Sequence, residues 1–419
     1  MFSKFWRSII HDKLFSTIYI FGTALALAST TVAVVVLNSM IAPVYPEYNR
    51  LQSAFISQIQ LEVGDTGSYQ YSMSYDLVRD QIYNLKNATE VSAYMQPWNE
   101  SYITPADGGL ELPVTIKPVD PAFFEVYNFR FLAGRPISRE EFESGLPVAV
   151  IGENTARETF GSGNPEDYLG KTVTVDFADY NVVGVVKEPT HAQTDSYAGV
   201  YMPYTSHPEY NESNNGMPCI GPLKAVIETD DIDALKAEID DFESRFNSSQ
   251  QEYQVHFFAQ PMSHTDKALG RRWYDSDFSL SSIALTFAVV ILSLLLIPSF
   301  NLSGIISGHM ETRIAEMGLR KSFGATRSRL LREVLVENLS FTLAGGIIGY
   351  ALAYIILKCG IADMFQDEYI ATDMTNEMIF SPIVFVSVFI ICTILNTISG
   401  LIPVYHALRR PIVQSLNEE

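Results

Sequence analysis

The sequence predicts an α-helical membrane protein with four transmembrane helices, one followed by three, and a large α+β extracytoplasmic domain between the first and second helices. Three observations predict this class: four long stretches without charged residues, a basic bias beside them, and a long acidic stretch with alternating apolar residues. The chain has 419 residues, 47% of them hydrophobic, yet its formal net charge is −20. The charge must therefore lie outside the apolar stretches.

Four stretches contain no Asp, Glu, Lys or Arg, and each reaches the roughly 20 residues that a helix needs to cross a bilayer core. They are residues 14–45, 278–310, 338–357 and 378–408. A helix is expected in each, because it satisfies its own backbone hydrogen bonds where lipid offers no partner. We predict transmembrane helices over residues 16–42, 280–303, 334–357 and 379–404.

The first stretch has a second interpretation, because basic residues precede it and Ala24-Leu25-Ala26 or Ala26-Leu27-Ala28 resembles a signal-peptidase site. Its apolar run is longer than the ~7 to 15 residues of a signal-peptide core. An uncleaved membrane anchor is the better fit.

Basic residues indicate the orientation, because Lys and Arg beside membrane helices are retained on the cytoplasmic side. Taken together, the amino-terminal segment, the segment before the third helix and the tail 405–419 contain 11 basic residues and 6 acidic ones. Both termini are therefore expected in the cytoplasm, and the loop 358–378 outside it. The large domain between the first and second helices is then expected outside the cytoplasm. An acidic exported domain argues against nucleic acid as a partner.

Residues 1–15 place apolar side chains on one helical face and Lys4, Arg7 and Lys13 elsewhere. This pattern predicts an amphipathic helix lying on the inner leaflet. A plain basic flank of the first span is the alternative.

Two segments that flank the large domain are predicted to form stalks. Residues 43–65 carry apolar residues four apart, at Leu51, Phe55, Ile59 and Val63, which indicates that helix continues beyond the membrane. Residues 261–279 are polar and mostly free of proline, so helix is expected to continue there into the second span.

Residues 66–260 are expected to form the α+β domain, with two subdomains. Strands are predicted where apolar residues alternate between turn residues, as in "LPVTIKPVD", "LPVAVIG", "KTVTVDFADYNVVGVVKEP" and "QVHFF". "DIDALKAEIDDFESRF" predicts an amphipathic helix, with Ile232, Leu235, Ile239 and Phe242 on one side.

The sequence offers no catalytic or metal-binding motif that we recognise. Its His residues show no HExxH spacing, no GxSxG elbow is present, and there is no GxxxxGK[ST] phosphate-binding loop. Cys219, Cys359 and Cys392 indicate no disulfide framework. We expect a non-catalytic subunit with no cofactor and no metal, whose energy source, if it uses ATP, is a partner.

Two features of the membrane helices stand out. Gly345, Gly349 and Ala353 recur every fourth residue, which allows close helix packing. They predict either a dimer seam or packing on the chain's own second or fourth helix. Pro298 is expected to kink the second helix by removing a backbone hydrogen bond.

Residues 308–333 predict two short helices hinged at Gly324. Acidic residues come early and basic residues late in the first, as the helix dipole favours, and Gly324 is placed to end it. Thr326 is placed to cap the next helix. The residues alone leave two interpretations open: a docking surface for a cytoplasmic protein, or a basic loop on lipid head groups.

The stretch "ETRIAEMGLRKSFGATRSRLLREVLVENL" resembles the signature loop of the MacB/FtsX-like permeases of ABC transporters. Four further stretches resemble, in order, the exported domain of the MacB type: "VDPAFFEVYNFRFLAGRPISREEF", "LPVAVIGENTARETFG", "LGKTVTVDFADYNVVGVVKE" and "VYMPY". Ser322 stands where the family usually has Ala or another small residue.

The resemblance implies that the loop holds a coupling helix that docks on a separate ABC ATPase subunit, which binds ATP and Mg²⁺. The residues it assigns to coupling are Arg313, Glu316, Met317, Gly318, Arg320, Lys321, Gly324 and Ala325. It also implies a stand-alone permease that works with a second copy of itself or a related permease. An extracytoplasmic adaptor or an outer-membrane protein is a further expected partner.

Two functions from different classes follow from the resemblance. The first is an exporter subunit that moves a peptide, drug, toxin or lipoprotein by mechanotransmission, in which ATP-driven closure of the partner moves the exported domain. The second is a signalling scaffold that regulates an external partner such as a cell-wall hydrolase. The size of the exported domain favours the first.

Overall fold

The computed structural model describes most of the chain and divides it into two compact units. The described residues are 13–64, 67–97, 101–106, 108–191, 193–207, 210, 218–249, 252–275, 277–359 and 374–409. The helix unit holds residues 1–39 and 281–419, and the ectodomain holds residues 40–280. The predicted interfacial helix over 1–15 lies almost entirely outside the described residues.

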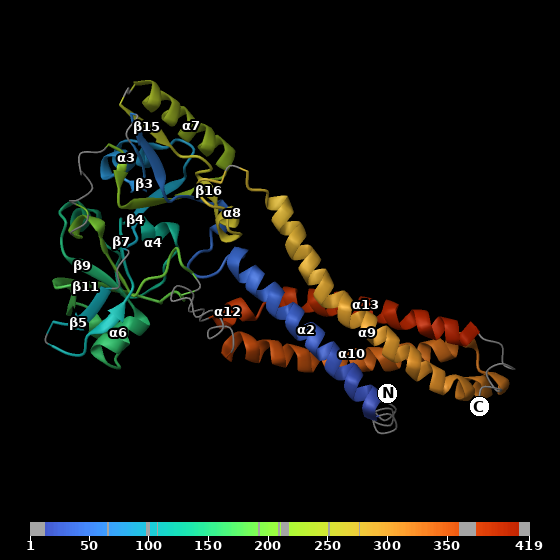
Figure 1. Cartoon of the computed structure of the whole chain (residues 1–419). Helices are drawn as coiled ribbons and strands as arrows, with labels where there is room; N and C mark the ends of the chain where they lie inside the picture. Colours follow the sequence, from blue (N-terminus) through green and yellow to red (C-terminus); the bar gives the residue numbers. More distant parts are fainter. Residues whose placement is uncertain are drawn as a thin grey trace. The chain divides into compact units, whose positions relative to one another are not determined.

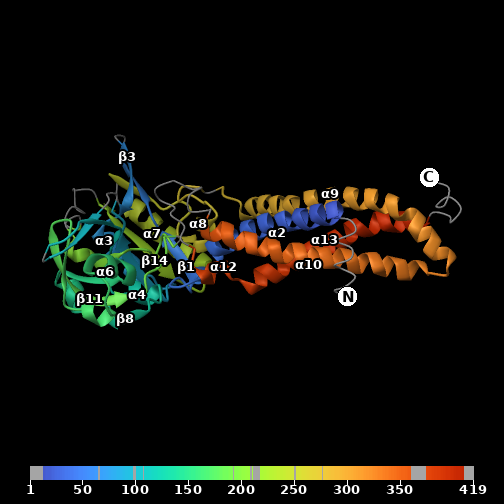
Figure 2. The same ribbon diagram turned by 90° about the horizontal axis from the view of Figure 1, so that it is seen from below.

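Among the described residues, the helix unit contains four long helices and one short one (Figure 1). They are α2 (Lys13–Ile41), α9 (Leu280–Ser322), α10 (Arg327–Cys359), α12 (Asn376–Ile379) and α13 (Pro382–Arg409). Figure 2 shows the long helices side by side. Three helices among the described residues are long and apolar enough to cross a membrane: Lys13–Ile41, Arg327–Lys358 and Asn376–Ile402.

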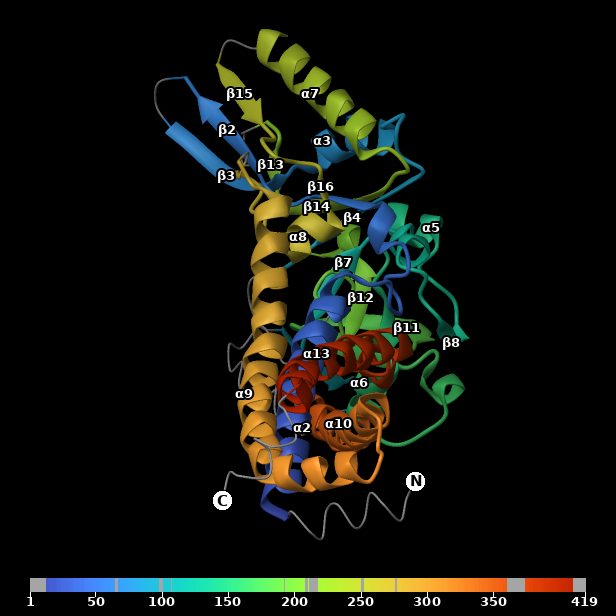
Figure 3. The ribbon, with the colours of Figure 1, turned by 90° about the vertical axis from the view of Figure 1, so that its right-hand side faces the viewer.

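The predicted second span, 280–303, falls on α9. Its apolar stretch among the described residues is Leu280–Leu296, which is shorter than the 18 residues required of a candidate membrane span. The helix itself is much longer than predicted. It runs uninterrupted through position 298 and ends at Ser322. The ribbon changes direction in its last turns, before α10 begins (Figures 2 and 3).

The small residues of α10 pack against the first helix, α2. A Cβ atom built on Gly345 would lie 2.9 Å from the carbonyl oxygen of Ile20, and one on Gly349 would lie 2.6 Å from that of Ala24. Ala353 is fully buried. The three atoms nearest to each of these two Cβ positions all belong to α2. The dimer seam stays a prediction that one chain does not test, although α2 already covers both glycines.

Hydrogen bonds join α9 to α13 at a point close to Pro298 in the sequence. Ser299 Oγ donates to Asn396 Oδ1 at 3.1 Å, and Ser399 Oγ donates to the Ser299 carbonyl at 2.6 Å. Tyr19 and Thr342 hydroxyls meet at 3.3 Å between α2 and α10. In lipid, contacts of this kind hold helices together where the hydrophobic effect does not.

The ectodomain is built on one mixed sheet. The strands are β1 (Ser53–Ile56), β2 (Ile59–Val63), β3 (Gly67–Met73), β4 (Glu90–Met95), β5 (Ser101–Pro105), β6 (Leu112–Val114), β7 (Ile116–Val119), β8 (Phe131–Gly134), β9 (Val148–Gly152), β10 (Thr172–Val175), β11 (Ala178–Val186), β12 (Val200–Pro203), β13 (Ile220–Gly221), β14 (Leu223–Glu228), β15 (Tyr253–His256) and β16 (Met262–Ser263). Their main order is β15-β2-β3-β14-β4-β7-β12-β9-β11-β10-β5-β6. Pairing is antiparallel except for β7 with β12 and β9 with β11. The strands predicted from alternating apolar residues are all present.

Five short helices and one longer helix among the described residues cover the sheet. They are α3 (Tyr75–Asp80), α4 (Phe123–Val126), α5 (Arg139–Glu143), α6 (Glu153–Phe160), α7 (Ile232–Ser249) and α8 (His264–Ala268), with 3-10 turns at Arg50–Gln52, Ile82–Asn84, Pro165–Tyr168 and Tyr204–Ser206. The longer helix, α7, is the amphipathic helix that the sequence predicts. Leu235 and Ile239 of α7 are buried in the core beside β15 (Figure 1).

The sheet narrows at its middle. β4 and β7 share one bridge, between Tyr94 and Val119. Separate hydrophobic clusters lie to either side, one around β2, β14 and α7 and another around β9, β11 and α6. The expected two subdomains would meet here, although residues 40–280 are compact as a whole.

Both predicted stalks are wrong. Residues 43–65 hold β1 and β2, and residues 261–279 hold β16 and the short α8, with turns between α8 and α9. Phe55 and Ile59 are buried in strands, while Leu51 is 70% exposed. A spacing of four is close to one helical turn and is also two strand periods, so it places side chains on one face of either structure.

We predict that Gly349→Leu will destabilise the helix unit. The added side chain would meet the Ala24 backbone, and overpacking of this kind costs about 1–3 kcal/mol. The melting temperature of the full chain in detergent should fall. Gly304→Leu in α9 is the control, since a Cβ atom there meets nothing within 4 Å. An equal loss in both variants would contradict close packing at Gly349.

Candidate functional site

The turn between α9 and α10 is built as the sequence predicts. Gly324 has a φ of +91°, a left-handed conformation that favours glycine, and a Cβ atom would meet nothing within 4 Å. The Ala325 amide donates to the Arg320 carbonyl at 3.0 Å, the bond that closes a Schellman-type helix end. Glycine is thus required by the backbone conformation rather than by crowding.

Thr326 begins α10. The Arg329 amide donates to Thr326 Oγ1 at 3.3 Å, and the Leu330 amide donates to the Thr326 carbonyl at 3.2 Å. Ala325 packs against a cluster that contains Leu330 and Val334. The two helices are therefore joined by a short turn that is capped on both sides.

The exposed surface of this turn combines charge with apolar side chains. Arg320 Nη1 lies 3.1 Å from Glu333 Oε2, and both side chains are about half exposed. Phe323 is 84% exposed and Leu319 is 52% exposed. Sequence reasoning missed Phe323, although an aromatic residue inside a polar turn is a signal for a docking contact. The side chains of Arg313, Glu316, Met317 and Lys321, and position 318, lie outside what the structure describes.

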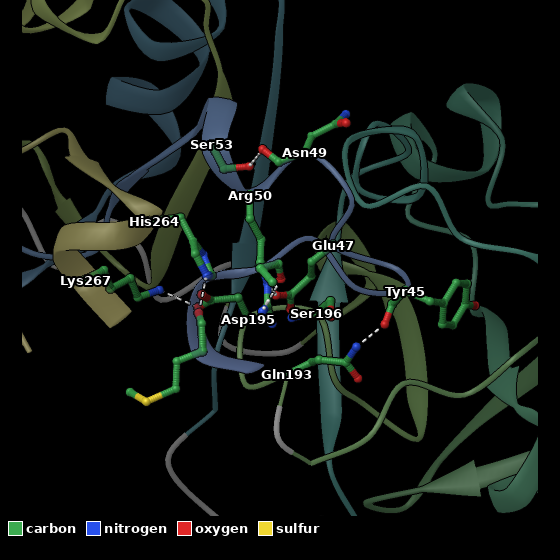
Figure 4. Close-up of polar contacts among 12 residues, drawn as sticks. Tyr45, Glu47, Asn49, Arg50, Ser53, Gln193, Asp195, Ser196, His264 and Lys267 are labelled. Atoms are coloured by element: carbon green, nitrogen blue, oxygen red, sulfur yellow. Dashed lines mark hydrogen bonds and ion pairs between the residues drawn. The ribbon is translucent and has the colours of Figure 1, made fainter. Parts of the chain in front are cut away.

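A second cluster, which the sequence did not predict, lies where the chain enters and leaves the ectodomain (Figure 4). We call it the junction; it contains Tyr45, Glu47, Arg50, Lys117, Gln193, Asp195, Ser196, His264 and Lys267. The entering segment is residues 40–50, and the leaving segment includes α8. Both are tied to the same loop, residues 193–198.

The entering segment is held by a buried ion pair. Arg50 Nε lies 2.8 Å from Glu47 Oε2, and both side chains are 3% exposed. Arg50 Nη1 donates to the Ala42 carbonyl at 2.9 Å. Glu47 Oε1 accepts from the Ser196 hydroxyl at 2.6 Å and from the Ser196 amide at 3.1 Å. A buried ion pair needs such additional hydrogen bonds to offset its desolvation.

Tyr45 fixes the same segment from its other side. Its hydroxyl donates to the Lys187 carbonyl at 2.6 Å, and its own carbonyl accepts from the Gln193 side-chain amide. The entering segment is therefore bonded at Tyr45 and Glu47 to the stretch between β11 and β12.

The leaving segment reaches the same loop. Lys267 of α8 forms an ion pair with Asp195 and also lies 4.0 Å from the centre of the Phe55 ring. His264 Nε2 lies 3.0 Å from the Met40 carbonyl oxygen, which connects the leaving segment to the entering one. β16 pairs with β1 beside this contact. The two connections to the membrane helices are thus joined to each other.

Lys117 of β7 lies under the loop. It is 2% exposed, and its Nζ donates to the carbonyls of Thr194 at 3.1 Å and Asp195 at 2.5 Å. Burial lowers the pKa of Lys117 to about 7, although Asp195 and Glu47 oppose the shift. Burial favours a higher pKa of Asp195, but Lys267, together with His264 and Lys117, brings this pKa below its usual value. Burial, together with Arg50, lowers the pKa of His264.

The junction has the chemistry of a structural clamp. Among the described residues, no group of three or more His, Cys, Asp or Glu side chains could hold a metal ion. The polar groups of the junction are directed at one another and at backbone carbonyls. Sequence reasoning missed the junction because its partners are far apart in the chain; Glu47 and Ser196, for example, are separated by 149 positions.

The long apolar helices, with a large sheet-based domain between the first and second of them, are the architecture of a membrane protein with a large domain outside the lipid. Residues 16–242 match the family model of the MacB-like periplasmic core domain, and residues 279–412 match that of the FtsX-like permease C-terminal region. The chain belongs to the MacB-like family of ABC transporter permeases, which confirms the resemblance. Permeases of this family work with an ABC ATPase, typically as dimers.

Relatives of two kinds match the chain. The uncharacterized ABC transporter permease YknZ of Bacillus subtilis is 24% identical over 58% of this chain and 57% of its own length. The macrolide export ATP-binding/permease protein MacB 1 of Yersinia pestis bv. Antiqua is 22% identical over 99% of this chain and 60% of its own length. The chain therefore spans about three fifths of the length of these relatives.

Two solved structures are similar to parts of the chain. The periplasmic region of MacB from Actinobacillus actinomycetemcomitans is 16% identical, with a TM-score of 0.34, over 48% of this chain and 88% of that one. The extracellular domain of YknZ is 17% identical, with a TM-score of 0.33, over 48% of this chain and 99% of that one.

We predict that Arg50→Met will strongly destabilise the ectodomain. It leaves Glu47 charged and buried without its ion-pair partner, which typically costs about 3–5 kcal/mol. Hydrogen exchange of the full chain in detergent should show faster exchange in residues 40–60. Arg139→Met is the matched control, because it breaks an exposed ion pair with Glu143 worth at most about 1 kcal/mol. Similar exchange in the two variants would contradict the clamp.

We also predict that Lys117 makes the stability of the ectodomain depend on pH. Its folded pKa of about 7 lies below the roughly 10.4 of an unfolded lysine, so between these values the unfolded state binds more protons. The free energy of unfolding should therefore rise from pH 7 to pH 10, by at most about 1.4 kcal/mol per pH unit. Urea unfolding followed by circular dichroism measures this.

Lys117→Met should make the rise smaller, and part of it should remain because burial lowers the pKa of Lys224 to about 8. Lys86→Met, which changes an exposed lysine, should keep the full rise. The prediction fails if the wild type and Lys117→Met show the same dependence on pH.

Proposed function

We propose that the chain is the permease subunit of a MacB-type ABC transporter, which couples ATP hydrolysis by a separate ATPase subunit to movement of its ectodomain. The partner subunit binds ATP and Mg²⁺, and this chain transmits the motion. The load is an exported molecule, such as a peptide, drug, toxin or lipoprotein.

The observation that carries the proposal is the capped turn at Gly324. It joins two long helices with a left-handed glycine and a threonine cap, and it exposes Arg320, Phe323 and Leu319. A turn that merely rests on lipid head groups needs no such fixed geometry. A partner that pushes on this turn moves stiff helices rather than a slack loop.

The contacts of the junction support the proposal that movement of the membrane helices reaches the ectodomain. The segments that follow α2 and precede α9 are bonded to each other and to the loop at 193–198, so a displacement of either connection acts on the folded domain. Buried ion pairs favour a discrete arrangement over gradual deformation, because an unpaired charge there is costly.

We propose that α9 is a fourth membrane span. Its apolar stretch Leu280–Leu296 continues into a sequence without charged residues up to position 310. Basic residues beside the spans favour cytoplasmic termini and a cytoplasmic turn at Gly324. The chain would then lie in the cytoplasmic membrane with the ectodomain outside the cytoplasm.

The signalling-scaffold alternative shares the membrane helices, and the FtsX-like match covers them in both cases. Purification of the tagged chain from its native membrane separates the two functions. A copurifying ATPase with an exported molecule, an adaptor or an outer-membrane protein supports the exporter; a copurifying cell-wall hydrolase supports the scaffold. Absence of any ATPase contradicts both.

The coupling turn can be tested by substitution. Gly324→Pro, or the pair Arg320→Glu and Lys321→Glu, should reduce ATP hydrolysis that depends on the permease while membrane insertion stays intact. The backbone at Gly324 needs a positive φ that proline cannot adopt, and the charge reversal removes the basic surface. ATPase assays on the assembled complex in nanodiscs give the readout.

Two controls sharpen this test. The swap Arg320→Glu with Glu333→Arg keeps the ion pair inside the turn, so it should stay uncoupled if Arg320 docks on the partner. Arg245→Glu reverses an exposed charge on α7 and should leave coupling unchanged. Normal coupling in the Arg320→Glu and Lys321→Glu variant would return the turn to the head-group interpretation.

A further inference from the structure

β3 has one edge without a partner strand among the described residues. Residues 67–71 pair with β2 in a continuous antiparallel register, from Gly67 with Val63 to Tyr71 with Ile59. The only other pairings of β3 in the described part of the chain are made at its end, by Ser72 and Met73 with β13 and β14. An open strand edge is a template for another strand.

This edge lacks the devices that normally protect one. Residues 68–71 are exposed on both faces of the strand, with Tyr69 39% and Tyr71 59% exposed. Figure 2 shows the β2–β3 hairpin projecting from the rest of the ectodomain. Residues 67–73, "GSYQYSM", contain neither a charged residue nor a proline. Natural edge strands usually carry a lysine, a proline or a bulge when they must stay unpaired.

The sequence of the edge is complementary to itself. Ser68-Tyr69-Gln70-Tyr71-Ser72 reads the same in both directions. If two such strands pair antiparallel with Gln70 opposite Gln70, each Tyr69 lies opposite Tyr71 of the other strand. Cross-strand aromatic pairs stabilise antiparallel sheets, and facing glutamines can exchange amide hydrogen bonds. The central three pairs fall entirely within the open edge.

The absence of charge on β3 favours a second copy of this chain as its pairing partner. The chain has a formal net charge of −20, so two ectodomains repel each other over much of their surface. A second copy can approach β3 with less repulsion than elsewhere, because this strand is uncharged. A basic partner, by contrast, would find no carboxylate on the strand itself.

We propose that two copies of this chain join their β3 strands antiparallel, with Gln70 opposite Gln70, to form one sheet across two ectodomains. The inference rests on the proposed function in that the assembled transporter holds two copies close together. The contact is short, so it depends on the high effective concentration within that assembly. The resulting interface is two-fold symmetric, with the same surface used by both copies.

Disulfide trapping in the full chain tests the proposal. Single cysteines are introduced at positions 67 to 71, one at a time, and native membranes are treated with a mild oxidant. Opposed residues in antiparallel strands have Cα atoms about 4.5–5.5 Å apart, within the range that a disulfide spans. Gln70→Cys should give the most disulfide-linked dimer. A maximum elsewhere, or no dimer at any position, overturns the pairing.

Two controls guard against random collision. Phe177→Cys places a thiol at the turn between β10 and β11, where the side chain is 99% exposed, and should give little dimer. Every variant also carries Cys359→Ser, and the parent chain with this change should give none, since its remaining cysteines, Cys219 and Cys392, are buried. If Phe177→Cys forms dimer as readily as Gln70→Cys, the trapping is collisional and the proposal is rejected.

Charge substitutions on either side of Gln70 test the register. In the Gln70→Cys chain, Tyr69→Lys with Tyr71→Lys sets like charges opposite each other and should abolish the dimer. Tyr69→Lys with Tyr71→Glu sets opposite charges against each other in this register and should retain it. Equal yields from the two variants contradict the register.

Failure of this proposal can be told apart from failure of the proposed function. Two copies with different tags are expressed together and purified through one tag with the ATPase. If both tags are recovered but no position forms a disulfide, the strand pairing is wrong and the transporter assignment stands. If a cysteine in β3 links to a different polypeptide, that partner occupies the edge and the second copy does not.

Discussion

A chain that crosses lipid must satisfy its backbone hydrogen bonds internally, and the arrangement of this protein depends on that constraint. It keeps α9 helical from Leu280 to Ser322, well past the apolar stretch. The chain changes direction in the last turns of α9 and at the capped turn before α10 (Figures 2 and 3). The proposed mechanism uses this stiffness, because force applied at the turn travels along helices that have no slack segment to absorb it.

In the ectodomain, the corresponding constraint is the burial of polar groups where the chain enters and leaves the domain. Under the proposed mechanism the domain receives force through two connections, and polar contacts hold both of them. Glu47, Arg50 and Ser196 are bonded to one another, and Lys117 donates to two carbonyls of its loop. Buried polar groups of this kind penalise partial opening steeply, because each lost partner leaves a desolvated group behind.

The sequence predicted elements well where one structure alone fits the pattern. Long uncharged stretches predict helices, the alternation in "KTVTVDFADYNVVGVVKEP" predicts β10 and β11, and Gly324 and Thr326 predict a turn. The prediction failed over 43–65, where a spacing of four fits both a helix and a strand. It was incomplete at Gly345 and Gly349, because small residues indicate a close neighbour without saying which one; the structure places α2 there. The junction was beyond prediction, since its contacts join residues from four distant parts of the chain.

The contact between His264 and Met40 brings the leaving segment of the ectodomain beside its entering segment. A domain with adjacent ends can be exchanged for one of another size without changing the spacing of the segments that it joins. The membrane helices and their turn can then stay the same while the exported domain diversifies. The same membrane helices could then serve different exported molecules through replacement of one continuous stretch of the chain, the ectodomain.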